Sequence, residues 1–259
     1  MNRACTIKAH QGGLFSLVNN VLTCMERYEH VHVDWSNSLY GAEDLYPKLF
    51  GRTNPESFYR PCPGYPMVPI PRDTILDYPD KWLTYTNPHK LYTGYQSWRN
   101  RMHPYWWRMG VLPHFTEFAE SFARVNFGAF NIGVLIRANT HAGEQINGIS
   151  QTLHDYMGWM DALEKRHPHA KFYVMCQDED SIDRLHQCYG NIITHPGVKR
   201  SATRDIDRHL HEPQTHEDAF VCLEEMLILS KCDVLIHPIS NIATAALIAN
   251  PALRSVYLE

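Results

Sequence analysis

Two segments of the sequence carry side chains whose types suit the binding of phosphate. Arg137 directly follows the apolar run 133–136, and a guanidinium at the end of a strand could hold two phosphate oxygens. Ser240 and Asn241 follow the apolar run 233–237 and precede an alanine-rich stretch, where a helix is expected to begin. A helix N-terminus offers free backbone N–H groups and the positive end of its dipole. The two segments together predict a diphosphate held between two strand ends.

Both segments also have interpretations that involve no ligand. Arg137 could instead form a surface ion pair, and Ser240 and Asn241 could simply cap the helix that they precede. Capping does not exclude anion binding, because a capped helix end still offers its other N–H groups.

Acidic residues lie close to both of these segments in the expected fold. Asp178, Glu179 and Asp180 follow an apolar run, where carboxylates could accept hydrogen bonds from a ribose or a base. The alternative is that they complement the dipole of the helix that follows. Glu224 and Glu225 lie inside an otherwise apolar helical stretch. One of them could accept from the paired N–H donors on the edge of guanine, and the other is expected to face solvent.

The glycine pair Gly12 and Gly13 follows the first expected strand. Glycines at such a turn could let a ligand approach the backbone, so the pair is a candidate for nucleotide binding. A plain tight turn is the alternative.

Regular strand and helix patterns are expected to position these side chains. A strand, a helix and a second strand are predicted between residues 6 and 35. After residue 114, apolar strand patterns occur at 131–137, 172–176, 191–194, 233–237 and 255–258. Helical patterns lie between them at 152–165, 181–189, 217–230 and 240–249. This alternation predicts an α/β fold with parallel strands and a ligand cleft beyond their carboxyl ends.

The segment 41–113 is expected to be irregular. Eleven of the 16 prolines fall in it, as do Trp82, Trp98, Trp106 and Trp107. A compact domain rarely keeps so long an irregular segment without a function, so we interpret it as binding loops. Its aromatic side chains could stack against an acceptor sugar or peptide, or could pin the segment to the core.

Composition excludes several classes of function. The 24 Lys and Arg against 28 Asp and Glu leave no surplus of positive charge for nucleic acid. The seven cysteines form no Cys-x-x-Cys pair, and the 16 histidines lack the His-Glu-x-x-His spacing, so no metal site is expected. The start lacks the apolar stretch of a signal peptide, and no run is long enough to span a bilayer. A soluble, cytoplasmic protein is therefore expected.

Four motifs in this order resemble the superfamily of GDP-fucose-dependent fucosyltransferases. They are Leu135-Ile136-Arg137, where the family has His-x-Arg; His154-Asp155-Tyr156-Met157, where it has Glu-Tyr-Met; Val174-Met175-Cys176-Gln177-Asp178-Glu179, similar to its Val-Ala-Thr-Asp-Asp; and Leu229-Ser230-Lys231-Cys232-Asp233 with Ser240-Asn241, similar to its Leu-Ser-x-Cys-Asp and Ser-Ser or Ser-Asn elbow. The arginine of the first motif is kept and its histidine is replaced. The lobe before residue 114 is also shorter than is usual in this superfamily.

The resemblance implies a role for several of these residues. Arg137 and Ser240 would hold the β-phosphate of GDP, Asp178 would stand near the nucleoside, and Glu225 would take the position that reads guanine. Glu144 falls within one position of the glutamate that serves as the base in the α1,6 enzymes. His141 and Asp155 are the rival candidates for this base.

The resemblance also implies an architecture and an activity. The fold would be GT-B-like, with two Rossmann-like lobes: a reduced, loop-rich acceptor lobe over residues 1–127 and a nucleotide-sugar lobe over 128–259. The protein would move fucose from GDP-fucose to a glycan acceptor with inversion and without a metal. A catalytically silent binding module and a transferase that uses another nucleotide sugar are the alternatives.

Overall fold

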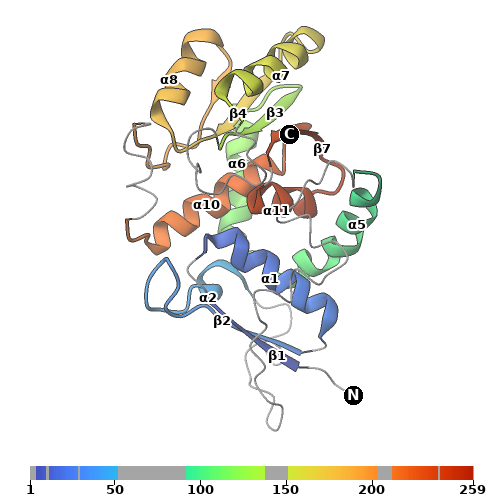
Figure 1. Cartoon of the computed structure of the whole chain (residues 1–259), viewed down its shortest axis with the longest axis vertical. Helices are drawn as coiled ribbons and strands as arrows, with labels where there is room; N and C mark the ends of the chain where they lie inside the picture. The colour runs from blue at the N-terminus through green and yellow to red at the C-terminus, as the bar shows by residue number, and fades with distance from the viewer. Residues whose placement is uncertain are drawn as a thin grey trace.

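A computed structural model describes residues 4–9, 12–28, 30–51, 92–137, 151–202, 212–238 and 240–258 of the chain (Figure 1). Its strands are β1 (Ala4–Lys8), β2 (His30–Asp34), β3 (Asn131–Leu135), β4 (Lys171–Met175), β5 (Ile192–Ile193), β6 (Val234–His237) and β7 (Arg254–Tyr257). Its helices are α1 (Leu14–Arg27), α2 (Tyr46–Leu49), α5 (Tyr92–Met109), α6 (Pro113–Asn126), α7 (Leu153–Arg166), α8 (Glu179–Cys188), α10 (His216–Leu229) and α11 (Asn241–Ala249). The expected alternation after residue 114 is confirmed, with small shifts at the boundaries.

The described strands form two sheets, and every pairing in them is parallel. One sheet has two strands in the order β1-β2, and the other has five in the order β5-β4-β3-β6-β7. Because neighbouring strands run in the same direction, their carboxyl ends gather along one edge of each sheet. The α/β class and its parallel sheets, which the sequence predicts, are therefore confirmed.

Strand β3 lies at the centre of the larger sheet and is buried along its whole length. Its side chains alternate between two apolar clusters, as strand geometry requires. Ile132 and Val134 belong to a cluster that includes residues of α7 and α8. Leu135 belongs to a second cluster, to which α1, α5, α6, α10 and α11 contribute. Helices thus cover both faces of this sheet.

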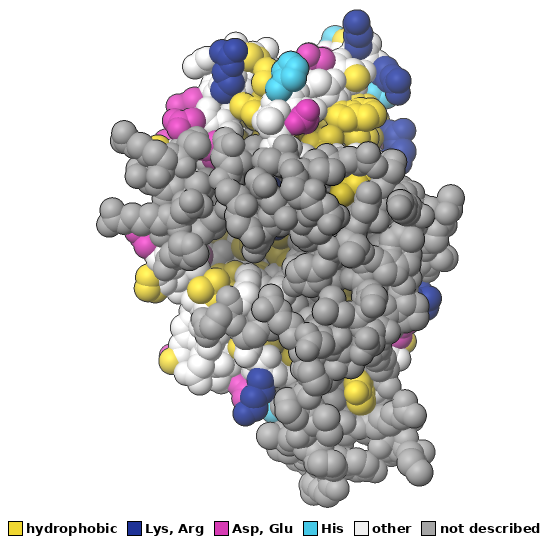
Figure 2. Space-filling model, in the orientation of Figure 1, with side chains coloured by type: hydrophobic (Ala, Val, Ile, Leu, Met, Phe, Trp, Pro, Cys, Tyr) yellow, Lys and Arg dark blue, Asp and Glu magenta, His cyan; other side chains and the backbone are white. Residues whose placement is uncertain are grey.

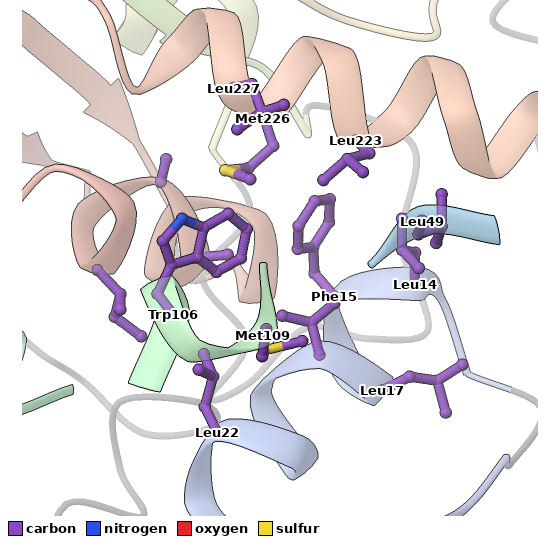
Figure 3. Close-up of a cluster of buried hydrophobic side chains, with 14 of the residues drawn as sticks. Leu14, Phe15, Leu17, Leu22, Leu49, Trp106, Met109, Leu223, Met226 and Leu227 are labelled. Atoms are coloured by element: carbon purple, nitrogen blue, oxygen red, sulfur yellow. The ribbon is translucent and has the colours of Figure 1, made fainter. Parts of the chain in front are cut away.

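The second cluster joins the beginning of the chain to the larger sheet. Figure 3 shows side chains of α1, α2, α5 and α10 meeting in it. The labelled residues are Leu14, Phe15, Leu17, Leu22, Leu49, Trp106, Met109, Leu223, Met226 and Leu227. One continuous core therefore includes residues on both sides of position 127, where the sequence predicts a boundary between lobes.

The segment 41–113 contains more helix than the sequence predicts. Helix α5 runs for 18 residues and contains Pro104, so the expectation of irregular loops is wrong for residues 92–109. Residues 52–91, with Trp82, lie outside the described residues. Trp106 is buried in the core, whereas Trp107 is 67% exposed. Trp106 and Trp107 therefore do not share one exposed surface.

Helix α5 is fastened to the edge of the larger sheet by a buried cation. Arg99 is 4% exposed. Its Nη1 donates to the carbonyl of Leu253 at 2.9 Å, and its Nη2 donates to Ser255 Oγ at 3.2 Å. Arg99 thus has a structural role.

The surface of the described residues is mixed in charge. On the face shown in Figure 2, side chains of both signs lie over the end of the molecule that α7 and α8 form. None of the described helices combines the length and the apolar character needed to cross a bilayer.

Gly133 lets α10 pack closely against β3, and this contact yields a prediction. A Cβ atom at this position would lie 2.9 Å from Leu229 Cδ2, 3.2 Å from Leu235 Cδ1 and 3.3 Å from Cys232 Sγ. We expect Gly133→Ala to lower the free energy of unfolding by about 1–3 kcal/mol, because the core is overpacked. Urea unfolding measures this change.

Gly158, in the middle of α7, provides the matched control. No heavy atom lies within 4 Å of a Cβ built there. Gly158→Ala should raise the free energy of unfolding by about 0.5–1 kcal/mol, through helix propensity alone. Equal effects of the two substitutions would show that the close packing at Gly133 is not required.

Candidate functional site

Arg137 and Ser240 meet at the carboxyl edge of the larger sheet. Strands β3 and β6 are neighbours in this sheet, and each of the two residues follows the end of one of them. Arg137 Nη1 donates to Ser240 Oγ at 3.4 Å. The backbone N–H of Arg137 donates to the hydroxyl of Tyr156, at 3.2 Å, which fixes the strand end against α7. The structure thus brings together the two side chains that the sequence assigns to phosphate, and their role in binding it stays a prediction.

Ser240 caps helix α11. Its Oγ accepts from the backbone N–H of Ile242 at 3.2 Å, and its carbonyl accepts from Thr244 N at 3.0 Å. One buried hydroxyl therefore contacts both the guanidinium of Arg137 and the first turn of the helix. The capping interpretation of this residue is confirmed, and it leaves the positive end of the helix dipole facing the guanidinium.

A residue of α1 holds this helix end from the other side. Asn19 Nδ2 donates to Asn241 Oδ1 at 3.1 Å and to the carbonyl of Asn241 at 3.3 Å. Asn19 is 6% exposed. The side chain of Asn241 is thus engaged with α1, and the start of the chain is hydrogen-bonded to the elbow. The sequence offers no signal for this contact, because 222 positions separate the two residues.

The glycine pair precedes α1. Gly13 is the N-cap of this helix and has φ −62°, a backbone angle that any residue can adopt. The hydroxyl of Tyr40 accepts from the backbone N–H of Leu14 at 2.9 Å, which gives the helix a cap from a distant side chain. The contribution of Gly12 and Gly13 to nucleotide binding stays a prediction.

Asp178 is the N-cap of helix α8 and is 1% exposed. Its carboxylate accepts a hydrogen bond from the hydroxyl of Ser181. Its backbone N–H donates to Cys176 Sγ at 3.4 Å. These contacts describe a residue that organises the start of a helix, and its predicted contact with a nucleoside stays a prediction.

Of the three candidates for a base, the structure describes one. Asp155 accepts from the backbone N–H of Thr152 at 2.6 Å and from its hydroxyl at 2.8 Å, and so forms the capping box of α7. The backbone hydrogen bond and then the hydroxyl bond hold the pKa of this carboxylate below its usual value. Glu144 and His141 lie outside the described residues.

Glu225 is a buried acid in the middle of α10. It is 4% exposed. Burial raises its pKa to about 8, with a small further increase from Glu224 and an opposing effect from the guanidinium of Arg200. Its Oε1 has no hydrogen-bond partner in the described part of the chain. At neutral pH the carboxyl group is therefore mainly protonated in this state.

Glu224, the neighbour of Glu225, does not simply face solvent. Its side chain is 18% exposed and its Oε2 lies 3.1 Å from His195 Nε2. His195 Nδ1 accepts from the backbone N–H of Gly197 at 3.0 Å, so Nε2 carries the proton that is donated to Glu224. Neither glutamate simply faces solvent, as was expected of one of them: Glu225 is buried, and Glu224 is largely covered and contacts His195.

Two further side chains with buried polar atoms, Arg200 and Tyr173, belong to this region, and the sequence analysis missed both. Arg200 Nε and Nη2 and the hydroxyl of Tyr173 have no hydrogen-bond partner among the described residues. Tyr173 lies in β4, and burial, followed by the charge of Glu225, raises its pKa well above the usual value. Buried polar groups are rarely left unsatisfied, so this cluster is typical of a site that binds a polar ligand.

Among the residues that the structure describes, no group of three or more His, Cys, Asp or Glu side chains could hold a metal ion. Of the three histidines that lie close together in the sequence at 209, 211 and 216, His209 and His211 lie outside the described residues. His216 Nδ1 lies 3.1 Å from Lys48 Nζ.

The structure is similar to solved fucosyltransferase structures. NodZ alpha-1,6-fucosyltransferase soaked with GDP-fucose matches with a TM-score of 0.57 and 14% identity, over 97% of this chain and 94% of that chain. A NodZ structure from Bradyrhizobium matches with a TM-score of 0.54 and 13% identity, over the same shares of the two chains. POFUT1 in complex with GDP-fucose matches with a TM-score of 0.54 and 10% identity, over 99% and 98%.

No family model matches the sequence, and the search of curated proteins also gives no match. The structural neighbours are GDP-fucose fucosyltransferases that cover nearly the whole chain, as the resemblance of the motifs implies. At this level of identity the likeness shows the fold, which this chain shares with them.

The raised pKa of Glu225 predicts how stability depends on pH. The folded state keeps its proton up to about pH 8, whereas the carboxyl of the unfolded chain loses it near its ordinary value of 4.5. The folded state therefore binds more protons between these values, and the free energy of unfolding should fall as pH rises, by up to about 1.4 kcal/mol per unit. Urea unfolding between pH 5 and pH 8 measures the slope.

The variant Glu225→Gln isolates this contribution, because it keeps the shape of the side chain and cannot titrate. His237, whose pKa burial lowers to about 4, titrates in both proteins and cancels in the comparison. The difference in stability between the variant and the wild type should grow with pH up to about 8 and then level off. A difference that does not change with pH would contradict a buried, protonated Glu225.

Proposed function

We propose that this protein transfers fucose from GDP-fucose to a hydroxyl group of a glycan or glycoconjugate, with inversion at the anomeric carbon. The observation that carries the proposal is the contact between Arg137 and Ser240 at the carboxyl edge of a parallel sheet. Structures with the same fold contain GDP-fucose. Residues 1–127 would bind the acceptor, and residues 128–259 would bind the donor in a GT-B-like arrangement of two lobes.

The proposed reaction is a single displacement. The acceptor oxygen forms a bond to the anomeric carbon of fucose while the bond from that carbon to the β-phosphate oxygen breaks. The electron pair of the broken bond leaves with GDP, and the acceptor proton passes to a base. Negative charge thus grows on the diphosphate as positive charge grows on the sugar ring.

Arg137 and the N-terminus of α11 would stabilise this growing negative charge. Both are fixed before the reaction, by Tyr156 on one side and by Asn19 on the other. Fixed donors stabilise the transition state more than the ground state, because the diphosphate carries more charge in the former. A guanidinium and a helix dipole supply the positive charge, so the proposed reaction requires no divalent ion.

Glu225 would recognise the guanine base. Without a ligand this carboxyl group is mainly protonated at neutral pH, and hydrogen bonds from a bound guanine would favour its ionised form. The ionised carboxylate can accept from both N–H donors on one edge of guanine, and adenine has no matching pair on that edge. Its buried position supports this role, since Oε1 has no hydrogen-bond partner among the described residues and could accept from such a ligand. Asp178, Gly12 and Gly13 would contact other parts of the nucleotide.

Glu144 is the proposed general base. Its rival Asp155 already accepts two hydrogen bonds and has a lowered pKa, which makes it a weaker base. His141 remains the other candidate. A carboxylate at Glu144 would take the proton of the acceptor hydroxyl as the new glycosidic bond forms.

Replacing Arg137 tests this proposal most simply. We expect Arg137→Ala to weaken the binding of GDP by about 10- to 100-fold, because one charge-assisted contact to phosphate is lost. Fucose transfer should fall further, since this contact strengthens as the diphosphate departs. Calorimetric titration with GDP and an assay of GDP release across glycan acceptors measure the two effects.

Arg254 provides a control for the loss of one positive charge. It is the first residue of β7 and so lies at the amino ends of the strands, away from the carboxyl edge, and its guanidinium packs over the ring of Phe130. Arg254→Ala should leave the affinity for GDP unchanged. If Arg137→Ala retains the turnover of GDP-fucose, or if both variants lose it equally, the proposed function is wrong.

A further inference from the structure

The segment 195–201 lies along helix α10 and contacts it through two side chains, those of His195 and Lys199. His195 Nε2 lies 3.1 Å from Glu224 Oε2, and Lys199 Nζ lies 2.7 Å from Asp218 Oδ1. Asp218 and Glu224 are six residues apart in α10, so the two contacts lie about 9 Å apart along the helix axis. The segment therefore runs along α10 in the opposite direction to the helix.

The same segment is also tied to the carboxyl end of strand β4. The backbone N–H of Ser201 donates to the carbonyl of Gln177 at 3.0 Å, and the carbonyl of Ser201 accepts from Glu179 N at 3.0 Å. Arg200 precedes Ser201, so its backbone is fixed between α10 and the strand end. Arg200 is thereby placed at the carboxyl edge of the sheet, where the candidate site lies.

Three side chains from three different elements present unsatisfied polar atoms in this place. They are Arg200 from the segment 195–201, Glu225 from α10 and Tyr173 from β4, and the atoms are Arg200 Nε and Nη2, Glu225 Oε1 and Tyr173 Oη. The guanidinium of Arg200 affects the pKa values of both Glu225 and Tyr173, so the three groups share one environment. Burying such groups without partners is costly, and a complementary ligand would remove that cost.

The cluster specifies what such a ligand must offer. The carboxylate of Glu225 accepts hydrogen bonds, whereas the guanidinium of Arg200 donates two in a fixed fork. A ring that fits must carry adjacent N–H donors next to a carbonyl acceptor. Guanine does so with N1–H, the 2-amino group and O6, whereas adenine places an amino group where the acceptor is needed.

We propose that Arg200 determines the specificity for guanine by donating to O6, while Glu225 accepts from N1–H and the 2-amino group. This inference rests on the proposed function, since it assigns the nucleotide of the donor. The hydroxyl of Tyr173, in β4, would offer the base a further hydrogen-bonding group. Two side chains thus read two different parts of one base, and they can be tested separately.

Three nucleotides separate the two contacts. GDP offers both, inosine diphosphate lacks the 2-amino group, and 6-thioguanosine diphosphate replaces O6 with sulfur, a poor acceptor. Calorimetric titration of each nucleotide into the full chain gives two affinity ratios. One compares GDP with inosine diphosphate, and the other compares GDP with 6-thioguanosine diphosphate. The wild type should prefer GDP to either analogue.

The variant Arg200→Met removes the guanidinium and keeps much of the side-chain volume. We expect it to bind GDP about 10- to 100-fold more weakly, because a charge-assisted contact to O6 is lost. It should lose the preference for GDP over the 6-thio analogue and keep the preference over inosine diphosphate. Glu225→Gln should lose the preference for GDP over inosine diphosphate and keep the preference over the 6-thio analogue. Arg200→Lys keeps the charge without the fork and should regain only part of the affinity.

Arg184→Met is the matched control, because this arginine of α8 is exposed and its Nη1 donates to Gln187 Oε1 at 3.3 Å on the same helix. It should leave both ratios unchanged, and thermal unfolding confirms that each variant is folded. If the wild type does not bind GDP, the proposed function fails. If it binds GDP and Arg200→Met keeps both ratios, or loses both equally, the assignment of Arg200 to O6 is wrong while the proposed function stands.

Discussion

The parallel pairing of β3 with β6 is the constraint on which the site depends. Because the two strands are neighbours in register, the residues that follow them emerge at the same edge, and Arg137 reaches the hydroxyl of Ser240. Helix α10 packs closely against β3 at Gly133, where a Cβ atom would lie 2.9 Å from Leu229 Cδ2. The same helix carries Glu225. A single packing arrangement therefore positions both the Arg137–Ser240 contact, which we assign to phosphate, and Glu225, which we assign to guanine.

The beginning of the chain contributes to this arrangement through packing and through one specific hydrogen-bonded pair. Side chains of α1 enter the core that covers the larger sheet, as Figure 3 shows. Asn19 of α1 donates to both the side chain and the carbonyl of Asn241, the first residue of α11. The helix end that we assign to phosphate is thus held between the guanidinium of Arg137 and a residue far away in the sequence. Such support keeps donors fixed where charge develops, which is how electrostatic stabilisation becomes effective.

The sequence predicts the elements around the site better than it predicts their contacts. Strands such as β3 and β6 are short apolar runs with clear ends, and Ser240 precedes a helix of small apolar residues. The two strands and the N-cap position of Ser240 therefore follow from the local sequence pattern. Helix α5 was missed because Pro104 and its mixed composition suggest a loop, although packing against the core stabilises it. Arg200 was missed for another reason: its place depends on a segment without regular structure, held by hydrogen bonds to α10 and to the end of β4. No local pattern records such contacts.

The central claim is that Arg137 and Ser240 act together on the β-phosphate of the donor. Calorimetric titration of GDP and of GMP into the wild type, Arg137→Ala, Ser240→Ala and the double variant tests it most directly, because the two nucleotides differ only in that phosphate. The account predicts that each single substitution weakens GDP and barely changes GMP. It also predicts that the double variant loses less affinity for GDP than the two single losses combined. Equal losses for GDP and GMP, or unchanged binding of both, would contradict it.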